Sequence, residues 1–302
     1  MKNFLTKLLL FLLPIILAGG IAEGALRTIP NDYATKSEAV MDQADTLEVL
    51  FFGSSHTLYG IDPSVMRIEG YNLAHPSQSL DLDYRLYQRF APHLPKLSTV
   101  VITVSSFSLF STLATGLEKW RLANYAMYYD LDLPWSLENQ TELFSNAFKT
   151  SALKLWRYYI SKQNPIRINA FGFQAKPASS TLDFTESAIL AASRHTYSDW
   201  SAFERQTKAL TDFVAAATAN GQRVILMIPP ATAAYVERIS TAQMEKTRKM
   251  LSELEASNPL VTVLDLLEDD RFELSDFYDA DHLNLQGAHK LSELLDHMIT
   301  TP

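Results

Sequence analysis

The sequence contains no cysteine among its 302 residues. Disulfide bonds, thiolate metal sites and a cysteine nucleophile are therefore excluded. Basic residues are also scarce, with 26 Lys and Arg against 34 Asp and Glu, so the formal net charge is −8. Nucleic-acid binding draws on clustered Lys and Arg, and the absence of such a cluster predicts no nucleic-acid partner. Glycine-rich phosphate loops and dinucleotide fingerprints are missing, so no cofactor is expected.

Long hydrophobic runs are absent except near the N-terminus. There, Leu8–Ala22 is a stretch of fifteen residues without a charge, and Lys2 and Lys7 precede it. A membrane-spanning helix needs roughly 20 apolar residues, which this stretch reaches if Lys7 extends its amine toward the headgroups. We predict that residues 1–26 form a retained signal anchor. A signal peptide cleaved near Ala18-Gly19-Gly20 and a buried core helix are the alternatives.

The charge around this segment predicts its orientation. Because positive residues stay on the cytoplasmic side, Lys2 and Lys7 place the rest of the chain outside the cytoplasm. The expected location is a single-pass cell-membrane protein whose body lies on the periplasmic or outer side. Residues 27–46 form a polar connector, and 47–302 form the body.

The body alternates short apolar runs with amphipathic segments. The apolar runs are the expected strands, and they lie at 47–52, 70–74, 98–105, 223–228 and 261–266. The expected helices lie at 79–90, 200–219, 241–256 and 285–299. Strands that are apolar on both faces are typical of a parallel sheet covered by helices. The pattern predicts an α/β fold, a flavodoxin-like three-layer α/β/α sandwich with a mainly parallel five-stranded sheet.

Residues 107–199 interrupt this rhythm. They separate the third and fourth strands by far more than the dozen residues that a crossover needs. The segment is rich in aromatic residues, and we interpret it as a large, partly helical insertion. It either caps the edge of the sheet or forms a satellite hydrophobic cluster without a functional role.

Candidate catalytic residues follow the first and last strands. Gly53-Ser54-Ser55 comes directly after the first strand, where a glycine permits a tight turn and free backbone N–H groups can hold an oxyanion. Asp279 and His282 follow the fifth strand, three residues apart. A serine nucleophile needs a base, and that base needs an orienting carboxylate. This spacing predicts a triad of Ser55, His282 and Asp279.

Two other interpretations of the second block exist. Asp281 is able to cap the helix that follows, with His282 as a surface residue. Asp279, Asp281 and His282 are alternatively metal ligands, but the absence of a further His/Asp cluster in the sequence disfavours a metal, and none is expected.

These residues resemble the SGNH (GDSL-type) hydrolase superfamily. That family has a serine after the first strand and a terminal Asp-x-x-His block, and Ser55, Asp279 and His282 hold those positions. Ser54 replaces the family's aspartate. This replacement and the run from Asp279 to Ala288 resemble a membrane-anchored branch, which includes the D-alanyl-transfer protein of teichoic-acid operons and alginate O-acetylation proteins. The resemblance covers roughly residues 45–105 and 220–300, and it implies a membrane-bound O-acyltransferase as partner.

Two family positions differ in this sequence. Ser77 stands where the family has an oxyanion glycine, and Ser106 stands nearest to the family's asparagine. The loss of one oxyanion donor can lower the rate by about 10²–10³. Other candidates for oxyanion or substrate binding are His56, Arg194 and His195.

The sequence therefore predicts an extracytoplasmic, serine-dependent acyl-ester enzyme. It is an O-acyltransferase or an esterase that acts on an acylated cell-surface glycan or polymer. The alternative is a non-catalytic SGNH-like scaffold or binding partner of a membrane-bound O-acyltransferase.

Overall fold

The computed structural model describes residues 2–178 and 183–301, and these divide into two compact units. The first unit comprises residues 1–37 and 118–167. The second comprises residues 38–117 and 168–302, and it holds the sheet. The predicted insertion 107–199 is thus shared between the units, because its central part packs with the N-terminal segment.

Five parallel strands form the sheet of the second unit, in the order β2-β1-β3-β4-β5. Their bounds are Val49–Phe52 for β1, Gly70–Asn72 for β2, Thr99–Thr103 for β3, Arg223–Ile228 for β4 and Val261–Asp265 for β5. In the central register Phe51 pairs with Val101, and Val101 pairs with Ile225. The predicted α/β fold class is confirmed, and each strand lies within its predicted run.

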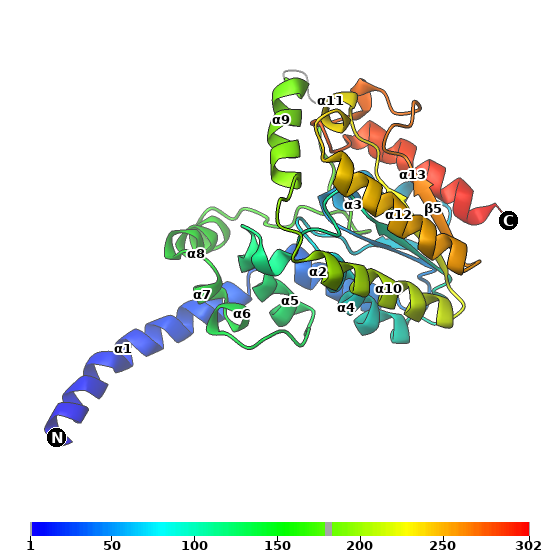
Figure 1. Cartoon of the computed structure of the whole chain (residues 1–302). Helices are drawn as coiled ribbons and strands as arrows, with labels where there is room; N and C mark the ends of the chain where they lie inside the picture. Colours follow the sequence, from blue (N-terminus) through cyan, green and yellow to red (C-terminus); the bar gives the residue numbers. More distant parts are fainter. Residues whose placement is uncertain (1, 179–182, 302) are drawn as a thin grey trace. The chain divides into compact units, whose positions relative to one another are not determined.

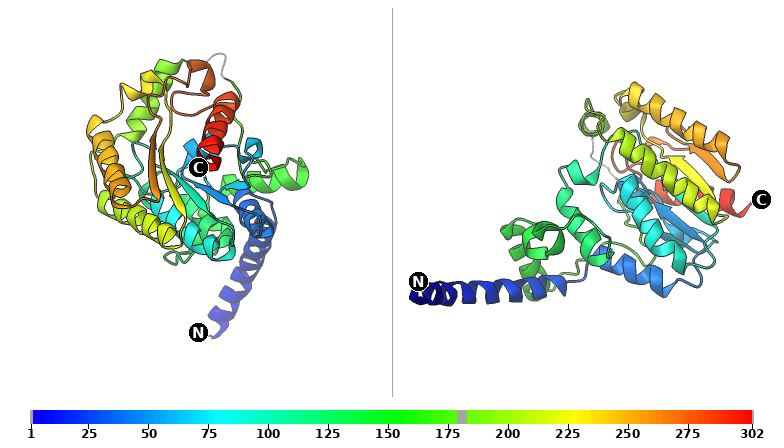
Figure 2. Two further views of the ribbon diagram at one scale, coloured as in Figure 1. Left: turned by 90° about the vertical axis from the view of Figure 1, so that its right-hand side faces the viewer. Right: turned by 60° about the horizontal axis from the view of Figure 1, so that its bottom comes forward.

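Helices cover both faces of this sheet, as Figures 1 and 2 show. The helices of this unit are α3 (Ser55–Gly60), α4 (Leu80–Phe90), α9 (Phe184–His195), α10 (Phe203–Ala219), α11 (Ala233–Val236), α12 (Thr241–Ser257) and α13 (Leu285–Thr300). Helices α4, α10 and α12 lie side by side over one face, and α13 lies on the other (Figure 2). The Phe213 ring of α10 packs 5.1 Å from that of Phe52 and 4.8 Å from that of Tyr87.

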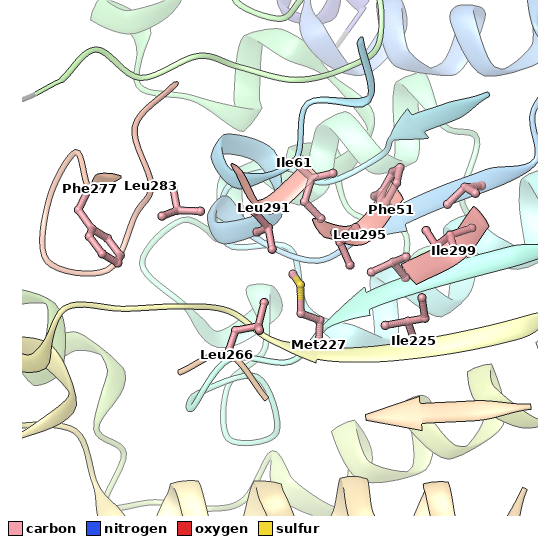
Figure 3. Packing of buried hydrophobic residues seen from close by; sticks show 12 residues of the cluster. Phe51, Ile61, Ile225, Met227, Leu266, Phe277, Leu283, Leu291, Leu295 and Ile299 are labelled. Carbon is pink, nitrogen blue, oxygen red and sulfur yellow. The ribbon is translucent and has the colours of Figure 1, made fainter. Parts of the chain in front are cut away.

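The hydrophobic core beneath α13 packs this last helix against the strands of the sheet. Leu291, Leu295 and Ile299 point from this helix toward the strands and pack with Phe51 and Ile225 (Figure 3). All five side chains are buried. Burying a side chain of this size contributes about 1.5–3 kcal/mol. The last helix is therefore integral to the fold of the second unit.

The turn after β1 requires a glycine. Gly53 has a φ of 139°, and a Cβ at this position would lie 2.4 Å from Thr57 Oγ1 and 2.9 Å from Thr103 Cβ. Its N–H donates to Asp83 of α4 at 3.2 Å. This combination lets the chain turn sharply out of the sheet, so that α3 begins two residues later at Ser55.

Asp83 makes stability depend on pH. Burial raises its pKa to about 7, although hydrogen bonds from Gln78 and Gly53 act in the opposite direction. The unfolded pKa is about 3.9, so the folded state holds the proton more tightly and loses this advantage as the pH rises through 7. The difference in unfolding free energy, Asp83→Asn minus wild type, should increase from pH 5 to pH 8 by about 2–3 kcal/mol. Urea denaturation of both proteins checks this, and a difference that is the same at both pH values would contradict it.

The first unit contains the N-terminal helix. Its helices are α1 (Lys2–Arg27), α5 (Leu122–Tyr128), α6 (Leu137–Gln140), α7 (Glu142–Ser145) and α8 (Phe148–Leu155), and α8 continues into a π-helical turn, Trp156–Ile160. The predicted connector contains α2 (Asp32–Asp42), which crosses the boundary between the units. Among the described helices, α1 alone is long and apolar enough to cross a membrane.

Candidate active site

Ser55 lies at the carboxyl edge of the sheet because Gly53 and Ser54 carry the chain from β1 into α3. Ser54 occupies the N-cap position of α3 in an extended conformation. Its hydroxyl is buried and has no hydrogen-bond partner among the described residues. Ser55 is the first residue of the helix, where backbone N–H groups have no intrahelical partner. The two adjacent serines therefore have very different surroundings.

The turn that carries Asp279 and His282 is closed by its own aspartate. The Asp279 carboxylate accepts the backbone N–H of Asp281 at 3.1 Å and that of His282 at 2.8 Å. Asn284, rather than Asp281, caps α13 by accepting the N–H of Gly287. Asp281 is consequently free to face inward, and the capping interpretation of this residue was wrong.

Ser55, His282 and Asp279 form a continuous hydrogen-bonded row. The distance from Ser55 Oγ to His282 Nε2 is 2.8 Å. On the other side of the ring, His282 Nδ1 lies 2.9 Å and 3.0 Å from the two carboxylate oxygens of Asp279. This is the order in which a nucleophile, a base and an orienting carboxylate must stand.

The electrostatics of His282 suit a proton acceptor. Burial alone would lower its pKa, but the negative charges of Asp281 and Asp279 outweigh burial, and the pKa lies above its ordinary value. The imidazolium form that arises when a base takes a proton is therefore stabilised by two carboxylates.

Asp281 connects three histidines. Its carboxylate oxygens lie 3.1 Å from His56 Nε2, 3.6 Å from His282 Nδ1 and 3.8 Å from His195 Nδ1. Burial would raise the pKa of Asp281, but the charge of His282 and the hydrogen bond from His56 hold it well below its usual range. Asp281 is thus a buried anion beside the row of Ser55, His282 and Asp279.

His56 completes one side of this cluster. Its Nδ1 lies 2.7 Å from Ser105 Oγ, and its ring stacks on that of His282 with 4.9 Å between centroids. When the Nε2–H of His56 donates to Asp281, Nδ1 accepts from the Ser105 hydroxyl, and both ring nitrogens are satisfied. These hydrogen bonds fix the orientation of the His56 ring, which packs against the ring of His282.

His195 lies on the other side, at the end of α9. Burial is the main cause that lowers its pKa to about 3, against the opposing charge of Asp281, so the ring is neutral. Its Nδ1 lies 2.7 Å from the hydroxyl of Tyr235, whose own pKa is raised by burial and by Asp281. When the Tyr235 hydroxyl donates to Nδ1, the hydrogen of the neutral His195 ring is on Nε2.

The remaining predicted residues lie around this cluster in different ways. The Ser106 hydroxyl lies 3.2 Å from that of Tyr235. Ser77 follows β2 with a φ of 58°, in the turn at the same edge of the sheet. Arg194 is exposed. Its positive charge helps to lower the pKa of His195, and it opposes the larger effect of burial on the pKa of Tyr235.

Three groups of the cluster also have the composition of a metal site. Ligand atoms of His56, Asp281 and His282 lie within 4.8 Å of one another. Both ring nitrogens of His56 and of His282 already have hydrogen-bond partners within the chain. We therefore interpret the cluster as a hydrogen-bonded network.

Tyr235 and Ser105 were not predicted as site residues, and Asp281 was considered only as a cap or metal ligand. Tyr235 belongs to α11, which follows β4, and the carboxyl ends of parallel strands are where sites form. This topological signal was present in the sequence, but no motif marks the residue.

A surface cleft of about 880 Å³ lies beside the start of α13, close in sequence to the turn that carries His282. Lys176, Asn284, His289 and Lys290 are among the residues that line it. The Lys176 amine lies 4.1 Å from the ring centroid of Tyr59, and that ring is 5.4 Å from the ring of His282. The contacts of Lys176 with Tyr59 and of Tyr59 with His282 link the lining of the cleft to His282.

Comparison with known proteins gave no match to a family model or to a curated protein. Two solved structures align over most of the chain. One is a Streptococcus pneumoniae protein provisionally described as a platelet activating factor, with 12% identity, a TM-score of 0.42, and coverage of 94% of this chain and 99% of the other. The second is a Bacteroides fragilis protein provisionally described as an acylhydrolase, with 11% identity, a TM-score of 0.40, and coverage of 86% and 93%. The site geometry stands independently of both.

Proposed function

We propose that this protein is a serine-dependent acyl-ester enzyme, an O-acyltransferase or an esterase of the SGNH type. The observation that carries the proposal is the row in which Ser55 Oγ lies 2.8 Å from His282 Nε2 and Asp279 holds Nδ1. Hydroxyl, imidazole and carboxylate in this order can activate an alcohol for attack on a carbonyl.

In the proposed reaction, Ser55 Oγ bonds to the acyl carbonyl carbon while its proton passes to His282 Nε2. The bond to the leaving alkoxide then breaks, and that oxygen takes the proton from His282, which leaves an acyl group on Ser55. A second hydroxyl gives its proton to His282 and attacks the acyl carbon, and Ser55 recovers its proton as the acyl group departs. Asp279 orients His282, and both carboxylates stabilise the imidazolium.

Hydrogen-bond donors for the developing oxyanion come from groups at the same edge of the sheet. We assign the backbone N–H of Ser55 and, from the turn after β2, that of Ser77 as donors. The Ser106 hydroxyl is engaged with Tyr235, so it is poorly suited to replace an asparagine. His195 is the stronger side-chain candidate, because its neutral ring carries a hydrogen on Nε2 when Tyr235 donates to Nδ1.

The second acceptor decides between transfer and hydrolysis. Water gives an esterase, and a sugar hydroxyl gives an O-acyltransferase. We assign an acylated cell-surface glycan or polymer as substrate, with the cleft lined by Lys176 and Lys290 as its path to His282. The apolar helix α1 supports anchoring in the cell membrane. Lys2 and Lys7 ahead of it favour a body outside the cytoplasm, and we assign a membrane-bound O-acyltransferase as partner.

A fluorophosphonate probe tests the proposal directly. The probe phosphonylates an activated serine, so the wild-type chain should gain one label, and peptide mapping should find it on Ser55. Ser54→Ala is the matched control and should label like the wild type, since Ser54 has no partner in the row. A wild-type chain that remains unlabelled, although it is folded, would contradict catalysis and favour the scaffold alternative.

A further inference from the structure

The first unit carries a set of large apolar side chains on its surface. Phe144, Phe148, Trp156 and Ile160 are 56%, 80%, 53% and 69% exposed, respectively. We call these four residues the aromatic face. They belong to α7, α8 and the π-helical turn, and Phe148 and Trp156 are two turns apart on a continuous helical segment. All four side chains lie within residues 144–160, and large exposed apolar patches mark surfaces that contact proteins or membranes.

Helix α7 is held against α1 at a definite position along the α1 axis. The Glu23 carboxylate accepts the N–H of Glu142 at 3.0 Å and that of Leu143 at 2.8 Å. A Cβ placed on Gly19 would lie 3.9 Å from Leu143 Cδ2, so Leu143 packs against this part of α1. The Tyr159 hydroxyl donates to the carbonyl of Ala25 at 3.0 Å. Figure 1 shows α7 and α8 beside the C-terminal part of α1.

This position on α1, near Glu23, coincides with the end of the apolar span. From Asn3 to Ala22, a helix that rises 1.5 Å per residue covers about 30 Å, the thickness of a hydrocarbon core. The first charged residue after the run is Glu23, which therefore marks the boundary between acyl chains and headgroups. Because Leu143 packs on Gly19, α7 lies on the acyl side of Glu23 or level with it.

The charge of the same segment differs from that of the whole chain. Residues 142–167, from the start of α7, contain five basic residues and one acidic residue, Glu142, which pairs with Lys154, whereas the chain has a net charge of −8. The basic residues are Lys149, Lys154, Arg157, Lys162 and Arg167. No two of them are adjacent in the sequence: three belong to α8 and the π-helical turn, and Lys162 and Arg167 follow that turn. Basic residues interleaved with Trp and Phe are typical of helices that lie in the interface of an anionic membrane.

We propose that α7, α8 and the π-helical turn lie in the lipid interface beside α1, as a second membrane contact. The side chains of the aromatic face enter the boundary between headgroups and acyl chains. Lys149, Arg157 and Lys162 bind the phosphates of anionic lipids. Continuity with the apolar span favours lipid as the occupant over a soluble protein, because a bilayer that holds α1 already surrounds the residues that pack on Gly19.

The absence of cysteine makes this measurable on the full chain. Phe148→Cys and Ile160→Cys, made one at a time, each provide one attachment point for a nitroxide. The labelled proteins are reconstituted in vesicles of phosphatidylcholine and phosphatidylglycerol, and collisions with oxygen and with a water-soluble nickel chelate are compared by electron paramagnetic resonance. Both labels should collide several-fold more with oxygen, relative to nickel, than a label at Leu274→Cys, an exposed position of the second unit.

Two further measurements decide the result. A label at Phe11→Cys, within α1, should report lipid, and if it reports water the proposal fails because α1 is not inserted. Labels at 148 and 160 that match the Leu274 label, while Phe11 reports lipid, would assign the aromatic face to a protein partner instead.

The basic residues are tested separately. The oxygen-to-nickel collision ratio of the Phe148 label should rise with the phosphatidylglycerol content of the vesicles. In Lys149→Gln/Arg157→Gln this rise should disappear, and an unchanged rise would contradict the role of these basic residues.

Discussion

Replacing Ser55 with alanine is expected to lower ester turnover by at least about 10⁴-fold. The variant retains the fold because Ser55 begins α3 without supplying its N-cap side chain. His282→Ala should cause a loss of similar size, since the 2.8 Å contact makes the two groups one catalytic unit. The double variant should lose little more than either single variant. Turnover of a chromogenic ester, with the protein amount fixed, measures all three.

Ser54→Ala is the control for these variants and should remain within about threefold of the wild type, because small surface or unpartnered changes perturb little. In cells, acylation of the surface polymer provides a second assay. If deleting the protein abolishes that acylation while Ser55→Ala and His282→Ala leave it intact, the protein acts as a scaffold.

The two carboxylates beside His282 should have separable effects. Asp279→Asn removes the group that orients the ring, and on the order of 10³–10⁴-fold of activity should be lost. Asp281→Asn leaves that contact in place and should cost less, on the order of 10²-fold. It also removes the charge that raises the pKa of His282. The base must be neutral to act, so activity rises with pH through this pKa, and Asp281→Asn should move the acidic limb to lower pH.

The size of the loss in kcat/KM distinguishes these roles, because both carboxylates raise the pKa of His282 and the acidic limb should move in both variants. An Asp281→Asn profile that keeps its acidic limb in place, with a loss in amplitude only, would mean that Asp281 acts by packing against His56. The circular dichroism of each variant controls for unfolding, because Asp281 is buried and has hydrogen-bonded neighbours.

The sheet was predictable from the sequence because its strands are buried on both faces and are bounded by turn residues. The pairing of Ser55 with Asp279 and His282 was also accessible, since these residue types follow the first and last strands and resemble a known block order. The role of Asp281 was not accessible, because no motif in the sequence pairs it with His56, 225 residues away. The packing of residues 118–167 with the N-terminal segment also depends on long-range contacts that hydrophobic periodicity does not encode.

The separation of 227 residues between Ser55 and His282 affects how the protein is made. At roughly 5–20 residues per second, β1 and α3 leave the ribosome on the order of 10–50 s before the turn at His282. During that interval the sheet face that α13 later covers is bare, and Ser55 has no base. A nascent chain therefore exposes this apolar face until α13 docks, and the row of Ser55, His282 and Asp279 forms only then.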